Sequence, residues 1–222
     1  MELWLARAEA LKYLQDERSS RLAVIERTFE LSDAIVDAFQ AVPDRTPYVT
    51  ACAVALVKAT NLAQGIFSLM LDGLAQEAGA LFRPMVEYTE LVIYFRLYPH
   101  MAERATVGDL PSAGERAKAI DSVYKKLREY LNAHASHSSF SDASVSHVID
   151  NQSQVLRKRQ RMVPHVLDRN LADLVVHNHL LLHEAILSLE VTNSPDFERL
   201  GERWDRLKTR MFDVFDLQPD QT

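Results

Sequence analysis

A chain of 222 residues is long enough for one large domain with a buried core. Hydrophobic residues make up 47% and charged residues 25%, which is typical of a globular protein, and the formal net charge of -6 excludes a surface that is basic all round. The single cysteine, Cys52, excludes an internal disulfide and a zinc site built from cysteines. Cys52 stands in the apolar stretch "ACAVALVKA" and is expected in the core, and we expect neither a cofactor nor a metal.

The first twenty residues mix acids and bases and lack the apolar centre of a signal peptide. No uninterrupted apolar run approaches the roughly 18 residues of a membrane span. We therefore expect a cytoplasmic protein without a membrane partner.

The first half of the chain has helical periodicity almost throughout. Apolar residues recur three and four apart between Leu3 and Phe39, which predicts one long helix. "PDRTP" at 43–47 interrupts it, and its last two residues suit the cap and first position of a helix over about 48–72. A third helix is expected over about 74–98, bent by its internal proline.

The second half begins with a linker, "YPHMAERATVGDLPSAGE", that has room for one extra turn of helix. A helix is predicted over about 114–133. The stretch 144–163 fits either a short hairpin about Asp150 and Asn151 or a poorly periodic helix. Further helices are predicted over about 164–191 and 195–215.

These elements predict an all-α fold, a bundle of five or six main helices in up-and-down order because the connections are short. We expect one domain over residues 1–222. In it the N-terminal helix, 1–41, packs on a core bundle, 48–191, and a C-terminal helix covers 195–215.

Two stretches carry a resemblance. "ALFRPMVEYTELVIYFRLYP" (80–99) resembles the helix with the pattern Ala-x-x-Arg-x-x-x-Glu of a widespread bacterial family grouped with the HEPN-like helical domains. "YKKLREYLNAHASHSSF" (124–140) is similar to the later segment of that family, with a tyrosine and then His, a small residue and Ser. The resemblance implies a HEPN-like helical bundle whose relatives are metal-independent ribonucleases, often toxins or antiviral effectors, that act as dimers.

The helix over 74–98 carries a polar stripe on an otherwise apolar surface. Its residues are Arg83, Glu87, Glu90 and Tyr94, spaced four, three and four apart on one face. Because unpaired buried charges are costly, we expect the charged members to be mostly buried and bonded to each other, or to line a polar pocket. Glu87→Ala is then expected to destabilise the protein by about 3–5 kcal/mol.

Arg128 and His134 are the candidate catalytic pair. The resemblance implies that the histidine transfers a proton at the ribose 2′-hydroxyl and that the arginine stabilises the phosphate charge. On an unbroken helix the two positions lie roughly 240° apart, so they converge only if the helix ends near Asn132 or across a dimer interface. The alternative is a helix end at which His134 continues the apolar stripe and His137 belongs to the following loop.

Two further groups of residues allow a site. His179 and His183 are one turn apart and would suit two metal ligands, with Glu87 or Glu90 as a third, but His177 does not share their face and solvated or core-edge histidines are favoured. The run "RKRQR" concentrates positive charge and is either a solvated surface or an RNA contact. Its charged residues are Arg157, Lys158, Arg159 and Arg161.

The sequence thus leaves three functions open, and with them whether the protein is an enzyme. The first is a HEPN-like protein that interacts with RNA, including a metal-independent ribonuclease of a toxin or defence type. The second is a non-catalytic module that binds a small ligand or a protein such as an antitoxin. The third is a structural domain that forms a homodimer.

Overall fold

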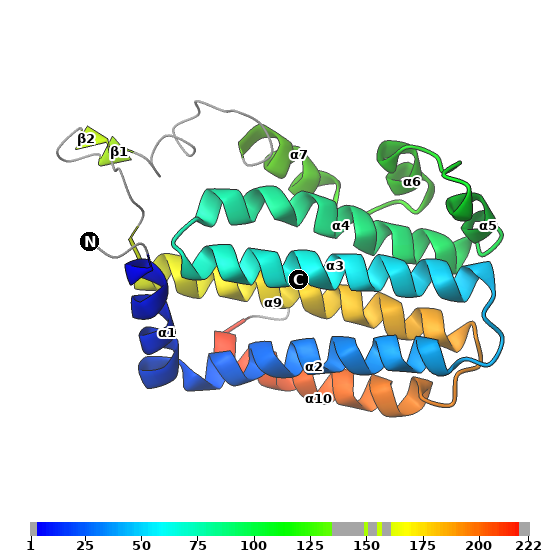
Figure 1. Ribbon diagram of the computed structural model, residues 1–222, viewed down its shortest axis with the longest axis horizontal. Coiled ribbons are helices and arrows are strands. Elements are labelled where there is room, and N and C mark those ends of the chain that lie inside the picture. The colour runs from blue at the N-terminus through cyan, green and yellow to red at the C-terminus, as the bar shows by residue number, and fades with distance from the viewer. Residues whose placement is uncertain (1–3, 135–148, 151–154, 157–160, 218–222) are drawn as a thin grey trace.

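A computed structural model describes residues 4–134, 149–150, 155–156 and 161–217, and the side chains of His134 and Asp150 are outside this description. Five long helices lie side by side along the molecule (Figure 1). They are α2 (Ser19–Ala41), α3 (Pro47–Leu71), α4 (Ala75–Leu97), α9 (Pro164–Glu190) and α10 (Phe197–Phe215). The all-α class and the helical bundle are confirmed.

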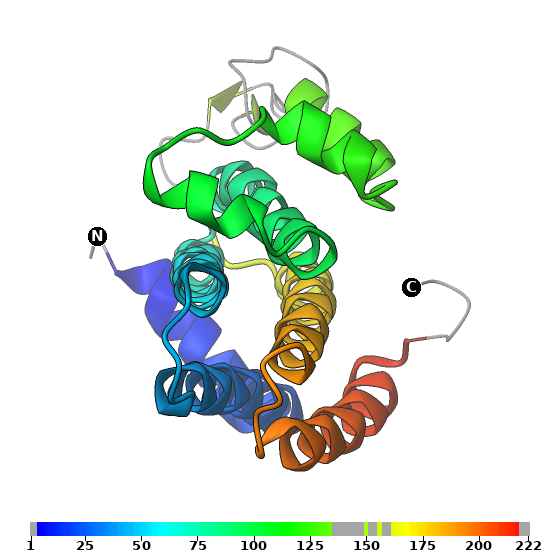
Figure 2. The same ribbon diagram turned by 90° about the vertical axis from the view of Figure 1, so that its right-hand side faces the viewer.

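The end-on view shows how the long helices surround one core (Figure 2). α3 packs against α2, α4 and α9, and α10 packs against α2 and α9. The core is continuous and apolar, with Phe39, Leu56, Ile66 and Phe95 among its most deeply buried side chains. α2, α3 and α4 follow each other up and down, whereas α9 runs in the same direction as α4 (Figure 1). The up-and-down order therefore fails between α4 and α9, where the connection is long.

α3 begins where its sequence signal predicts. The Thr46 hydroxyl accepts a hydrogen bond from the Val49 amide at 3.3 Å, and Pro47 occupies the first turn, where it removes no helical bond. Cys52 on this helix is completely buried, and burial raises the pKa of its thiol to about 12, so it is a core residue as predicted. α3 is long and apolar enough to cross a membrane, but a core helix can have the same length and composition. In its most apolar 18-residue stretch, 44% of the residues are buried.

The predicted helix over 3–39 is wrong in one respect, because two helices occupy it. α1 (Leu5–Glu17) ends at Arg18, where the chain turns before α2. Asp168 on α9 explains the turn: its carboxylate accepts hydrogen bonds from Tyr13 Oη at 2.8 Å and Arg18 Nε at 3.2 Å. Arg21 Nη1 lies 2.9 Å from the same carboxylate, so residues on both sides of the turn meet one acid on a distant helix.

The predicted helix over 114–133 is likewise divided. The linker holds α5 (Met101–Thr106), and then come α6 (Ala113–Ala119) and α7 (Lys125–His134). α6 starts with a capping box in which the side chains of Ser112 and Glu115 bond to each other's backbone amides. All three short helices lie on the α4 side of the bundle (Figures 1 and 2).

The ambiguous stretch contains a small antiparallel hairpin in its described part. β1 (Ile149–Asp150) pairs with β2 (Val155–Leu156), with Ile149 opposite Leu156. Of the two alternatives for 144–163, the described residues fit the hairpin.

Candidate functional site

The two segments that carry the family resemblance meet where α7 packs on α4. Glu90 of α4 has a side chain only 1% exposed. Its Oε2 accepts a hydrogen bond from Arg128 Nη1 of α7 at 3.0 Å, and its Oε1 accepts one from Ser122 Oγ at 2.5 Å. Arg128 Nη1 also lies 3.4 Å from the Ala113 carbonyl of α6, so this guanidinium joins three helices.

The break between α6 and α7 is what brings Ser122 to Glu90. Asp121 has a φ of 48°, a left-handed conformation that aspartate tolerates better than most residues, and it ends the helical path. The Ser122 amide then donates to the Ala117 carbonyl at 2.9 Å, and the Ser122 hydroxyl accepts from the Tyr124 amide at 3.1 Å. An unbroken helix would not have placed this hydroxyl in the same way.

A second ion pair lies beyond this site and joins α4 to α9. Arg96 Nη2 donates to Glu184 Oε2 at 2.6 Å, and the two side chains are 25% and 19% exposed. Tyr124 is buried in the neighbourhood of Glu184 and Glu90, and burial, with the charges of these carboxylates, raises the pKa of its hydroxyl. A tyrosine in this state stays protonated near neutral pH.

The polar stripe of α4 is divided between two environments. Arg83 Nε donates to Glu87 Oε1 at 3.1 Å, but the two side chains are 35% and 28% exposed. Glu90 is buried and bonds to Arg128 and Ser122, and Tyr94 is buried against Tyr98, with ring centroids 5.1 Å apart. The prediction for Arg83, Glu87 and Glu90 is therefore confirmed in part: Arg83 and Glu87 are partly buried and bond to each other, whereas Glu90 bonds to Arg128 and Ser122 instead.

The proposed catalytic pair, Arg128 and His134, lies on α7. This helix runs through Asn132 to His134, so the two positions are about 240° apart around its axis. The side chain of His134 lies outside the described residues, so convergence of the pair within one chain stays a prediction. His137 and the serine run that follows it lie outside the described residues, and convergence across a dimer interface stays a prediction.

The histidines of α9 pack against aromatic rings. The ring centroids of His179 and His183 lie 4.3 and 4.4 Å from that of Trp204 on α10, in stacked geometry. Trp204 Nε1 donates to the His179 carbonyl at 3.0 Å. His177 lies apart from this stack, with its Nδ1 2.7 Å from the Asp173 carbonyl and its ring edge-on to Phe82.

Burial lowers the pKa of His179 to about 3, and it lowers the pKa values of His177 and His183 as well. In the part of the chain that the structure describes, no group of three His, Cys, Asp or Glu side chains is arranged to hold a metal ion. His179 is therefore a buried core residue and His177 and His183 lie at the edge of the core, and the partner that the sequence did not predict is Trp204. Trp204 is 21 positions from His183 and 25 from His179, so no local sequence pattern predicts this stacking.

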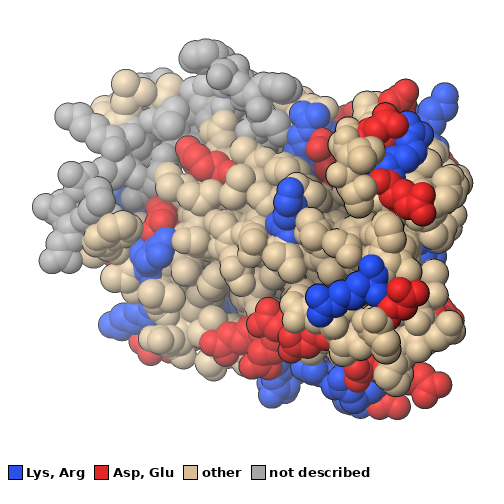
Figure 3. Space-filling view, turned by 45° about the vertical axis from the view of Figure 1, so that its right-hand side comes forward, with Lys and Arg blue, Asp and Glu red and all other residues tan. Residues whose placement is uncertain are grey.

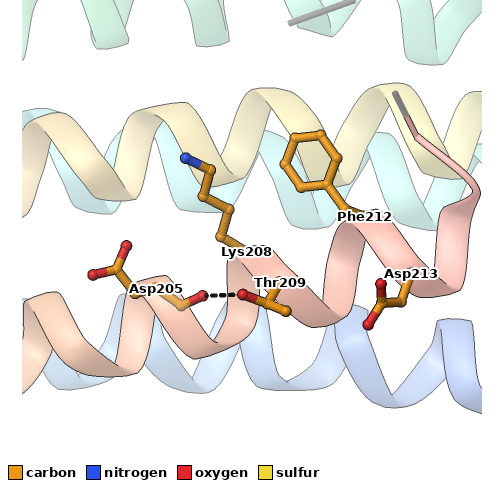
Figure 4. Close-up of a pocket in the computed structure, with 5 residues that line it drawn as sticks. All are labelled: Asp205, Lys208, Thr209, Phe212 and Asp213. Atoms are coloured by element: carbon orange, nitrogen blue, oxygen red, sulfur yellow. Dashed lines mark hydrogen bonds between the residues drawn. The ribbon is translucent and has the colours of Figure 1, made fainter. Parts of the chain in front are cut away.

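The basic run lies mostly outside the described residues. Arg157, Lys158 and Arg159 are not described, and Arg161 is exposed just before α9. α10 has a surface depression of about 500 Å³ (Figure 4), lined by Asp205, Lys208, Thr209, Phe212 and Asp213. All five residues belong to one helix, and the two acids flank a single lysine, so this depression has no concentrated charge.

No protein-family model, curated protein or solved structure shows a significant match to this chain.

Proposed function

We propose that this chain is a HEPN-like helical protein that binds RNA and leaves it intact. In this proposal Arg128 has no catalytic role. The support for a HEPN-like protein is the ordered pair of motifs at 80–99 and 124–140, whose helices meet at Glu90 and Arg128. RNA is the partner that the resemblance implies. The loss of cleavage is inferred from the state of Arg128.

The observation that carries the proposal is the ion pair between Arg128 Nη1 and Glu90 Oε2 at 3.0 Å. A guanidinium that stabilises a phosphate in a transition state must turn its donors toward the phosphate. Here the same group compensates a carboxylate with an exposed fraction of 1%. If Nη1 were turned to a phosphate instead, this carboxylate would stay buried without its partner, which costs several kcal/mol. Arg128 is therefore a positioning residue for α7.

The alternative of a small-ligand module has less support. It relied on a polar pocket along α4, but Arg83 and Glu87 pair with each other, partly buried, and Glu90 is enclosed by Ser122 and Arg128. The depression on α10 and the hollow between α2 and α10 are both lined by residues of other elements than α4. A homodimer and a protein partner such as an antitoxin stay predictions.

The test measures RNA binding and RNA cleavage on the same preparations, with a chelator present. The variants are Arg128→Ala, Arg128→Lys and His134→Ala, with Arg45→Ala and His165→Ala as matched controls at exposed positions. We expect the wild type to bind RNA and to leave it intact. Thermal melts identify variants that fail to fold, and Arg128→Lys retains the charge if Arg128→Ala is too unstable.

Chelator-resistant cleavage by the wild type that is lost in folded Arg128 and His134 variants, and kept in both controls, would establish a ribonuclease instead. Cleavage that is equal in all preparations would indicate a contaminant. Absence of RNA binding in the wild type would overturn the proposal.

A further inference from the structure

A groove of about 410 Å³ lies between α2 and α10, on the opposite side of the bundle from α7. Its walls carry four arginines and one glutamate, above a floor of two leucines. α2 contributes Arg27, Glu30 and Leu31, and α10 contributes Arg203, Arg206, Leu207 and Arg210. In Figure 3 acidic and basic side chains gather together along the lower edge of the molecule, the edge that α2 and α10 form in Figure 1, below a broad face with few charges.

The arginines of this groove are largely uncompensated. In the described part of the chain Arg27, Arg203 and Arg210 form no salt bridge, and Arg206 has only an exposed contact of 3.5 Å with Glu202. By contrast Arg7, Arg21, Arg96, Arg104 and Arg128 each lie within 3.0 Å of a carboxylate oxygen. A local excess of positive charge thus occurs on a chain with a formal net charge of -6.

The spacing on α10 makes this excess costly without a ligand. Arg203, Arg206 and Arg210 are three and four positions apart and therefore share one face of the helix. Like charges at this spacing destabilise a helix by a few tenths of a kcal/mol for each pair. An anion in the groove would remove this repulsion, since guanidinium groups bind phosphate oxygens in a fork of two hydrogen bonds.

Arg203, Arg206 and Arg210 form an arginine row along α10, and its length favours a chain of phosphates over a single phosphate. Arg203 and Arg210 are seven positions apart, which is about 10 Å along the helix axis. Successive phosphates of a stacked strand rise about 3.4 Å, so this length spans about three nucleotides. The floor residues Leu31 and Leu207 are 1% and 8% exposed and leave no apolar anchor point for a peptide.

We propose that the α2–α10 groove binds the phosphodiester backbone of single-stranded RNA without recognising its bases. The proposal rests on the proposed function in taking RNA as the partner, and it assigns the contact to a surface distant from Arg128. The residues that line the groove include no aromatic ring on which a base could stack. Binding is therefore electrostatic and independent of sequence.

The experiment measures fluorescence anisotropy of labelled oligouridine and oligoadenosine, each about ten nucleotides long, across a salt series. With three to four phosphate contacts, log K for the wild type should fall with log salt at a slope of about -2 to -3. The double variant Arg203→Ala/Arg210→Ala should reduce the magnitude of the slope of log K against log salt by about 1.4. It should also weaken RNA binding by about tenfold or more at low salt. Both oligonucleotides should bind alike.

Two controls separate the groove from general charge effects. Arg45→Ala and Lys118→Ala together remove two charges at exposed positions on other elements and should change the slope by less than about half a unit. Arg203→Lys/Arg210→Lys keeps the charge and should retain the slope. Thermal melts verify that each variant folds, because Arg203 is partly buried although Arg210 is exposed.

The outcomes distinguish this inference from the proposed function. RNA binding that is unchanged in the double alanine variant, or equally weakened in the control, overturns the groove and leaves RNA binding standing. A wild type that binds no RNA overturns both. Tighter binding of polyglutamate than of RNA would overturn the phosphodiester assignment and identify an acidic peptide as the ligand.

Discussion

Arg128 on α7 reaches across to Glu90 on α4, and the 3.0 Å contact between Nη1 and Oε2 neutralises a carboxylate that has almost no access to water. The two residues are 38 positions apart. Their pairing fixes the short helix α7 against the bundle and withdraws the guanidinium from solvent.

Arg128→Ala should destabilise the protein by about 3 kcal/mol, because it leaves the Glu90 carboxylate buried with only the Ser122 hydroxyl as partner. Chemical denaturation measures the change. Arg104→Ala is the matched control, since its pair with Asp109 is exposed, and it should cost less than about 0.5 kcal/mol. A loss below about 1 kcal/mol for Arg128→Ala would mean that water replaces the guanidinium.

Glu87→Ala should cost less than about 1 kcal/mol, and not the larger loss that a buried stripe would imply. Its partner Arg83 is 35% exposed and can be hydrated when the carboxylate is removed. The same denaturation experiment measures it. A loss of about 3 kcal/mol or more would show that another segment covers the pair.

Thr60→Val should cost about 1–2 kcal/mol, because it leaves the buried Ser32 hydroxyl without the 2.6 Å hydrogen bond that joins α2 to α3. The double variant Ser32→Ala/Thr60→Val should lie within about 1 kcal/mol of the wild type, since neither polar group remains. A double-mutant cycle measures the coupling. If the loss of unfolding free energy in the double variant equalled the sum of the losses in the two single variants, the pairing of Ser32 with Thr60 would be contradicted.

His179→Leu should make stability less sensitive to acid. The pKa of His179 is lowered from 6.5 to about 3 in the folded protein, so only the unfolded chain takes up a proton between these values. Stability that is fully present above about pH 6.5 is lost as the pH falls toward 3. The facing groups are Trp204, His183 and Lys208, and the latter two lower the pKa further through their positive charge.

The measurement compares unfolding free energies of the wild type and His179→Leu at about pH 7.5 and about pH 5. The variant should gain about 2 kcal/mol relative to the wild type over this interval. His177 and His183 remain in both proteins, so their contributions largely cancel. An equal difference at both pH values would show that the pKa of His179 is the same in the folded and the unfolded protein.

The sequence by itself determined the long helices α3, α4, α9 and α10 and, within about two residues, where they begin. The apolar periodicity of α3, α4 and α9 and the Thr46–Pro47 cap are local signals, because a helix bonds to itself within four residues. The position of Cys52 in the core follows from the same pattern. These features depend only on residues that are close to each other in the sequence.

The tertiary structure alone decided the partners of the polar groups. The break at Arg18 depends on Asp168, 150 positions away, and the break before α7 places Ser122 on Glu90. The arginine row of α10 faces Arg27 only because α2 and α10 are adjacent. Periodicity indicates which residues are buried, but it does not indicate which distant charged group each of them contacts. Ion pairs and aromatic stacks form between helices, and the packing of the helices depends on the core as a whole.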